Sequence, residues 1–147
     1  ALRSGEPSVT LRSGPKGDTG VGATGPAGPP GNGSGSSLLV AGVSNVSRNV
    51  VRYTVPTVIG STATSIVNVP MPAGTATRLY AASASRVNGT VTVFRNGAAT
   101  ALTCNFGNST SCSNLIDSVT FFEGDTISFK VSSRTSTSWV NLTVGFA

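Results

Sequence analysis

The side chains best suited to acid–base or nucleophilic chemistry are scarce in this chain. Its 147 residues include no histidine, which removes the commonest general base, the commonest transition-metal ligand and every triad built on imidazole. After residue 36 the carboxylates are Asp117, Glu123 and Asp125. Two carboxylates about 5–10 Å apart hydrolyse glycosides, and three offer oxygen ligands to Ca²⁺. Because Glu123 and Asp125 flank Gly124, we instead expect a solvated turn with Gly124 at positive φ, no enzyme, no metal site and no cofactor.

Cys104 and Cys112 are the only cysteines in the sequence. Structural zinc usually needs about four cysteine or histidine ligands, and redox-active pairs have the spacing C-x-x-C, so neither kind of site fits. We expect a structural disulfide across a hairpin, which would contribute about 2–3 kcal/mol by restricting the unfolded chain. Two buried free thiols are the alternative.

The chain carries a net charge of +5, and its basic residues after residue 36 are scattered without forming a run. They do not interleave with aromatic residues, so the pattern predicts no nucleic-acid binding. Solubility and pairing between copies explain a scattered basic surface, and anionic glycans or lipid headgroups are alternative partners. No window approaches the ~18 apolar residues of a membrane-spanning helix, and we expect no membrane insertion.

Apolar residues after residue 36 alternate with polar ones, as is typical of half-buried β-strands. The segments with this period are 90–93, 127–132 and 140–146, and residues 76–84 also fit a strand. Asn88-Gly89 and Asn96-Gly97 are type I′ hairpin signals that bracket one strand of about six residues. About eight to ten short strands with regular turns predict a β-sandwich.

Glycine recurs at every third position near the N-terminus, in two frames that are one residue out of phase. The first frame holds Gly14, Gly17 and Gly20, and the second holds Gly22, Gly25, Gly28 and Gly31. Only glycine fits at the axis of a collagen triple helix, where three extended chains wind together. We therefore expect a homotrimer with these glycines at the axis. About six triplets are too few to hold three chains together, so the C-terminal part must maintain the trimer.

These patterns divide the chain into three parts. Residues 1–13 are expected to be an N-terminal attachment segment, residues 14–36 a collagen-like stem with a Gly/Ser exit, and residues 37–147 a β-sandwich knob. The stem would span roughly 50 Å at about 3.1 Å per residue. Trp139 is expected just before the last strand, on the face opposite Val140. Its alternative roles are packing in the core or the trimer interface, and stacking on a glycan.

The segment GTVTVFRNGAATALTCNFGNSTSCSNLIDSVTFFEGDTISFKVSS, residues 89–133, resembles the C-terminal heads of collagen-like trimers. It combines Asn-Gly, two close cysteines, a hydrophobic strand, Gly-Asp and an alternating strand. Such heads are similar to the tumour-necrosis-factor-like jelly roll, and they occur on bacteriophage fibres and on bacterial spore and surface proteins. The resemblance implies an all-β, homotrimeric jelly-roll knob behind a triple-helical stem. It also implies a trimer interface built from the aliphatic and aromatic residues of one sheet.

The expected function is that of a structural virion-surface protein. In this interpretation a trimeric spike, head fibre or tail fibre projects its knob for attachment to a host-surface glycan or for capsid decoration. Residues 1–13 would bind a capsid or tail protein. One alternative is a bacterial surface or spore-coat adhesion protein. Another is a glycan-degrading enzyme, which the missing histidine and the sparse carboxylates disfavour.

Overall fold

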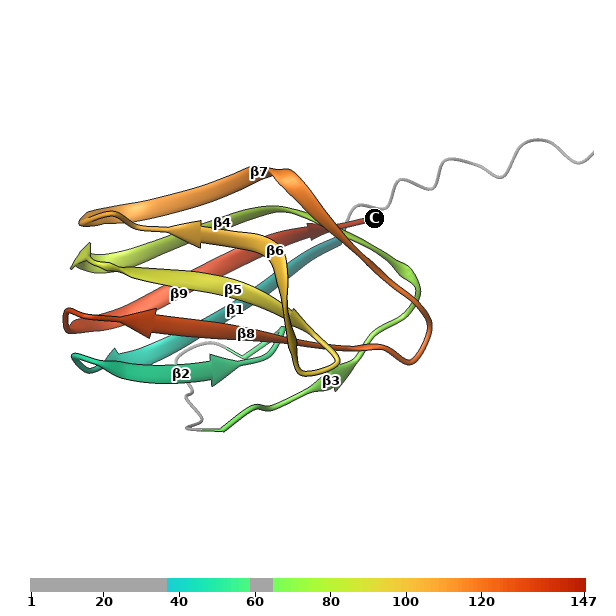
Figure 1. The fold of residues 1–147 in the computed structure, drawn as a ribbon, viewed down its shortest axis with the longest axis horizontal. Helices are drawn as coiled ribbons and strands as arrows, with labels where there is room; N and C mark the ends of the chain where they lie inside the picture. Colours follow the sequence, from blue (N-terminus) through green and yellow to red (C-terminus); the bar gives the residue numbers. More distant parts are fainter. Residues whose placement is uncertain (1–36, 59–64) are drawn as a thin grey trace, which may run out of the picture. The chain divides into compact units, whose positions relative to one another are not determined.

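A computed structural model describes residues 37–58 and 65–147 of the chain (Figure 1). These residues form nine strands and no helix, which confirms the predicted all-β class. The strands are β1 (Ser37–Val46), β2 (Val50–Thr54), β3 (Val69–Pro70), β4 (Gly74–Val87), β5 (Gly89–Arg95), β6 (Ala98–Asn105), β7 (Ser109–Phe121), β8 (Thr126–Ser133) and β9 (Thr137–Phe146). The predicted attachment segment, residues 1–13, and the predicted stem, residues 14–36 with the seven glycines expected at its axis, lie outside the described residues. Nothing in the described part is a helix long and apolar enough to cross a membrane.

The strands form two antiparallel sheets that pack face to face as a β-sandwich. Sheet A has the strand order β1-β9-β4-β7, and sheet B has the order β2-β8-β5-β6, with the short β3 also paired to β8. Consecutive strands therefore often lie in different sheets, and the chain crosses between the sheets at the ends of the sandwich (Figure 1).

The core is built from the alternating residues that the sequence singles out. On β9, Val140, Leu142 and Val144 are almost completely buried, and on β8 the same holds for Ile127 and Phe129. Polar neighbours such as Asn141 and Lys130 point to the other side of each sheet. One buried and one solvated face is the arrangement that a two-residue period produces in an antiparallel sheet. The strand assignment of these segments is thus confirmed.

The two Asn-Gly signals have different outcomes. At Asn96-Gly97 both residues have positive φ, of 50° and 78°, and they close the β5–β6 hairpin as a type I′ turn requires. The hairpin prediction at Asn88-Gly89 is wrong. Asn88 lies where the chain passes from β4 in sheet A to β5 in sheet B. The glycine is explained by close approach, because a Cβ atom at Gly89 would collide with the backbone carbonyl of Ser132.

The outer edge of β1 is covered by the chain that follows β2. The amide of Gly42 donates to the carbonyl of Val58 at 2.7 Å, and the amide of Thr57 donates to the carbonyl of Val40 at 2.6 Å. These bonds use backbone groups that an open edge strand would expose. Sheet A is therefore closed on this side without a further strand.

The two ends of the sandwich are distinct. We call the end where β1 begins the base: Ser37 pairs with Phe146 there, and Ala147 exchanges two backbone hydrogen bonds with Thr75. We call the opposite end the tip. It consists of residues 47–49, 84–88, 106–110 and 134–136, which include the four connections at this end and the adjoining ends of β4 and β7. In Figure 1 the tip is at the left, and the C-terminus at the base is marked on the right.

Candidate binding surfaces

The turn between β7 and β8 holds Asp125, one of the carboxylates considered for catalysis. Gly124 has φ of 90°, as expected for this turn. The Asp125 carboxylate accepts hydrogen bonds from Arg95 Nε at 2.7 Å, from Asn96 Nδ2 at 2.7 Å and from the Phe122 amide at 2.9 Å. The Asn96 bond, followed by the Phe122 amide bond and Arg95, lowers the pKa of Asp125. A general acid needs the opposite shift. The three hydrogen bonds instead show that this carboxylate joins the β5–β6 turn to the β7–β8 turn.

The three carboxylates are not gathered into one site. Glu123 is exposed next to Asp125, whereas Asp117 lies in a bulge of β7 and accepts a hydrogen bond from Asn114 Nδ2 at 2.8 Å. Among residues 37–58 and 65–147, no three acidic, cysteine or histidine side chains come close enough to hold a metal ion. The Ca²⁺ alternative therefore has no ligand set in the described part of the chain.

Cys104 and Cys112 are joined by a disulfide, with an S–S distance of 2.04 Å and a Cα–Cα distance of 5.7 Å. The expectation that it crosses a hairpin is wrong. Cys104 belongs to β6 in sheet B, and Cys112 belongs to β7 in sheet A. The disulfide therefore links the two sheets along one side of the sandwich. A second link lies beside it, because Asn114 Nδ2 donates to the carbonyl of Thr103 at 2.8 Å.

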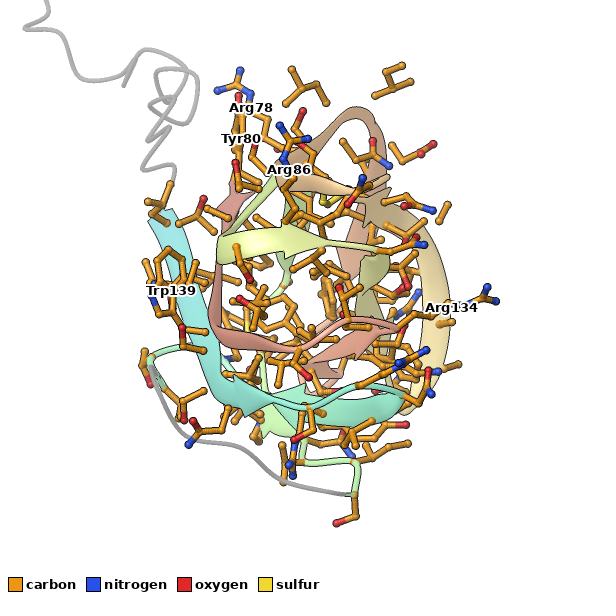
Figure 2. The ribbon with its side chains drawn as sticks, turned by 90° about the vertical axis from the view of Figure 1, so that its left-hand side faces the viewer. Arg78, Tyr80, Arg86, Arg134 and Trp139 are labelled. Atoms are coloured by element: carbon orange, nitrogen blue, oxygen red, sulfur yellow. A yellow bond between two sulfur atoms is a disulfide. The ribbon has the colours of Figure 1, made fainter. Side chains whose placement is uncertain are left out.

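Trp139 lies on the outer face of sheet A, within β9 rather than before it. Its side chain is 40% exposed, while its neighbour Val140 is fully buried, so the two point to opposite faces as predicted. Figure 2 shows Trp139 directed away from the sandwich. Exposure removes the core alternative for Trp139 and leaves packing against another copy or contact with a glycan.

The rest of this outer face is partly apolar, and its exposed charged residues, Arg78, Arg86 and Asp117, are confined to β4 and β7. Strand register places Val40, Thr143 and Tyr80 side by side across β1, β9 and β4. Tyr80 is 48% exposed, and Leu38 near the base is 66% exposed. A shallow depression of about 650 Å³ is lined by Val40, Tyr80 and Thr143 and by small residues of β4 and β7. Neither β1 nor β9 contains a charged residue.

The outer face of sheet B has a different chemistry. Its hydroxyl groups form cross-strand pairs: Thr90 with Ser132, and Thr92 with Thr103, both with oxygen atoms 2.9 Å apart. Lys130 Nζ lies 5.9 Å from the ring centroid of Phe94 on the same face. Hydrogen-bonded hydroxyl ladders and a lysine suit a solvated surface. Of the two outer faces, that of sheet A is the better candidate for contact between copies.

A further group of residues emerges only from the fold. Arg48, Arg86 and Arg134 are far apart in sequence and appear scattered there, but all three are exposed in the segments of the tip. Figure 2, which views the molecule from the tip, shows Arg86 and Arg134 reaching outward. Sequence reasoning missed this grouping because it depends on which loops meet at one end of the sandwich.

Comparison of the chain with protein-family models, with curated protein sequences and with solved structures found no match. The assignment of function therefore rests on the residues and geometry described above.

Proposed function

We propose that the chain is a trimeric spike of a virion surface, in which a collagen-like stem projects a jelly-roll knob. The observation that carries this proposal is the direct succession of two features. A glycine frame of the kind that three chains share ends at Gly31, and β1 of the sandwich begins six residues later, at Ser37. The strand orders β1-β9-β4-β7 and β2-β8-β5-β6 support the jelly-roll assignment.

The trimer contact is proposed to be the outer face of sheet A. Its strand β1 follows the stem in sequence, its two strands β1 and β9 have no charged residue, and it exposes Leu38, Tyr80 and Trp139. An exposed apolar face of this kind is characteristic of protein–protein contact. In this arrangement Trp139 packs between copies, and the three knobs surround one axis.

The trimer is tested by light scattering on the full chain. The expected mass is three times the 14.7 kDa of one chain. Tyr80→Arg should yield monomers, because three like charges would meet around the axis without partners. Val51→Arg is the matched control, since Val51 is also an exposed apolar residue, 36% accessible, but lies on β2 of sheet B. Monomeric wild-type protein, or equal dissociation of both variants, would contradict the proposal.

The stem and the location on a particle need separate experiments. Gly25→Arg should disrupt the local triple helix but leave a trimeric knob, and monomers in this variant would mean that the knob does not trimerise alone. For the location, electron micrographs of particles with and without the protein are compared. The spike proposal requires a surface feature that disappears with the protein.

A further inference from the structure

The tip combines three positive charges with an absence of negative ones. Arg48 lies in the β1–β2 turn, Arg86 at the end of β4 and Arg134 in the β8–β9 loop, and all are exposed. None of the carboxylates of residues 37–58 and 65–147 belongs to the tip segments. Asp125 and Glu123 lie in the turn at the base, and Asp117 lies in the β7 bulge opposite Arg78, between the Thr77 and Leu79 pairs.

Two of these arginines keep their guanidinium groups unengaged. Across the described residues, the only ion pair joins Arg95 to Asp125 at the base. Arg86 Nη1 donates to the backbone carbonyl of Asn108 at 3.3 Å, which leaves its remaining donors free. Arg48 and Arg134 contact the rest of the tip through their backbone amides alone. The tip therefore presents guanidinium donors without an acidic partner of its own.

The loops that carry the arginines are fixed to one another. The Arg48 amide donates to Ser136 Oγ at 3.1 Å, and the Arg134 amide donates to the Asn88 carbonyl at 2.9 Å. Asn88 in turn donates from its amide to Thr135 Oγ1 at 3.0 Å. These bonds tie the β1–β2, β4–β5 and β8–β9 connections into one surface. Little backbone ordering would then be needed when a ligand binds, which favours affinity.

The other side chains of the tip select the class of ligand. The segments between the arginines are rich in hydroxyl and amide groups, among them Ser47, Ser85 and Asn88. None of the exposed large hydrophobic residues of the described part lies in the tip segments. The tip thus lacks the aromatic platforms that stack nucleic-acid bases and the apolar anchors typical of protein interfaces. The recognition groups left at the tip are the guanidinium groups of its arginines. Their planar pairs of N–H donors match the geometry of carboxylate, sulfate or phosphate groups.

We propose that the tip binds an acidic polysaccharide, with Arg48, Arg86 and Arg134 contacting its anionic groups. This inference rests on the proposed function for one element, the outward presentation of the tip. The stem precedes Ser37 at the base, so the tip is the end of the knob farthest along the strands from that connection. Three copies would bring nine arginines to one surface, and weak single contacts would add up through multivalency.

The test uses the full chain and three dextrans of equal length: dextran sulfate, carboxymethyl dextran and uncharged dextran. Binding to the two anionic polymers and not to the uncharged one is expected, with affinity falling as salt is raised. Arg48→Ser combined with Arg134→Ser should weaken binding by about tenfold or more, because charge-assisted hydrogen bonds are lost. Adding Arg86→Ser should weaken it further.

The matched control is Arg78→Ser combined with Lys130→Ser, which removes the same net charge away from the tip. It should change affinity by less than about twofold, since distant exposed charges are screened. Equal loss in both double variants would overturn the proposal, because binding would then follow net charge alone. The proposal would also be overturned if the chain bound neither dextran sulfate nor carboxymethyl dextran. So would tighter binding to a single-stranded oligonucleotide or to phosphatidylglycerol vesicles than to the anionic dextrans.

Light scattering on the same samples separates this inference from the proposed function. A trimer that binds none of the polymers would overturn the glycan inference and leave the trimeric spike intact. A monomer whose binding depends on Arg48 and Arg134 would support the tip as the binding surface and overturn the trimer.

Discussion

The arginines at the two ends of the knob differ in their partners. At the base the guanidinium group of Arg95 is bound to a carboxylate, whereas at the tip the guanidinium groups of Arg48 and Arg134 have no acidic partner in the described part of the chain. Arg95 donates to Asp125 at 2.7 Å, and its guanidinium carbon lies 5.1 Å from the ring centroid of Phe122. Arg48 and Arg134 are held by their backbones only, and their side chains face solvent. The difference shows that a net positive charge alone says little about function. What matters is whether the fold supplies a carboxylate to each cation.

The largest effect on stability is expected from the disulfide, which lies between the two ends. Cys104→Ser combined with Cys112→Ser should lower the free energy of unfolding by about 2–3 kcal/mol, because the unfolded chain gains freedom. Chemical denaturation measures this loss. Hydrogen exchange should become faster in residues 106–110 of the tip than in the turn at Asp125, which has its own links. Uniform acceleration at both ends would contradict the independence of base and tip.

A smaller effect is expected when the base loses its ion pair. Asp125→Asn removes the charge and replaces one acceptor oxygen by a donor, so Arg95 or Asn96 loses its partner. The melting temperature should fall. Glu123→Gln is the control in the same turn. The Glu123 carboxylate is exposed and has no hydrogen bond or ion pair with the described residues, so this variant should leave the melting temperature unchanged. Equal melting temperatures for both variants would show that the Asp125 contacts contribute nothing.

The base should also give the knob a stability that depends on pH. The pKa of Asp125 is lowered in the folded protein, so the unfolded chain takes up this proton at a higher pH than the folded one. The stabilisation is fully present above the unfolded value of about 3.9 and is lost as pH falls through the lower folded value. Denaturation at pH values between about 2 and about 5 should show this slope in wild type and in Glu123→Gln. In Asp125→Asn the slope should be smaller.

The smallest effect on stability is expected at the tip. Arg48→Ser combined with Arg134→Ser should change the free energy of unfolding by about 0.5 kcal/mol or less, as is usual for exposed residues without partners. The same denaturation experiment measures it. A loss as large as that of the disulfide variant would mean that these arginines stabilise the fold, and the contrast between the two ends would no longer hold.

Sequence reasoning succeeded for features that depend on one strand alone, such as which of its residues are buried. The alternation in β8 and β9 identifies buried positions because each strand has one face in the core, wherever its neighbours lie. It failed at Asn88-Gly89, whose local signal equals that of Asn96-Gly97. The following strand pairs in the other sheet, and this depends on the whole topology.

The candidate surfaces show the same limit. Trp139 and Val140 could be placed on opposite faces from their alternation alone. The grouping at the tip joins segments as distant as Arg48 and Ser136, 88 positions apart, and no local pattern reports such a meeting. The partner of Asp125 was hidden for the same reason, because Arg95 lies in a different hairpin, 30 positions away.

The position of the last residue has a practical consequence. Ala147 is bonded to Thr75 at the base, at the opposite end of the strands from Arg48 and Arg134. A fluorescent protein or an affinity tag fused after Ala147 would therefore be attached at the base of the knob and away from its tip. On the proposal that the tip binds acidic polysaccharide, copies labelled after Ala147 should bind the anionic dextrans as tightly as the unlabelled chain does.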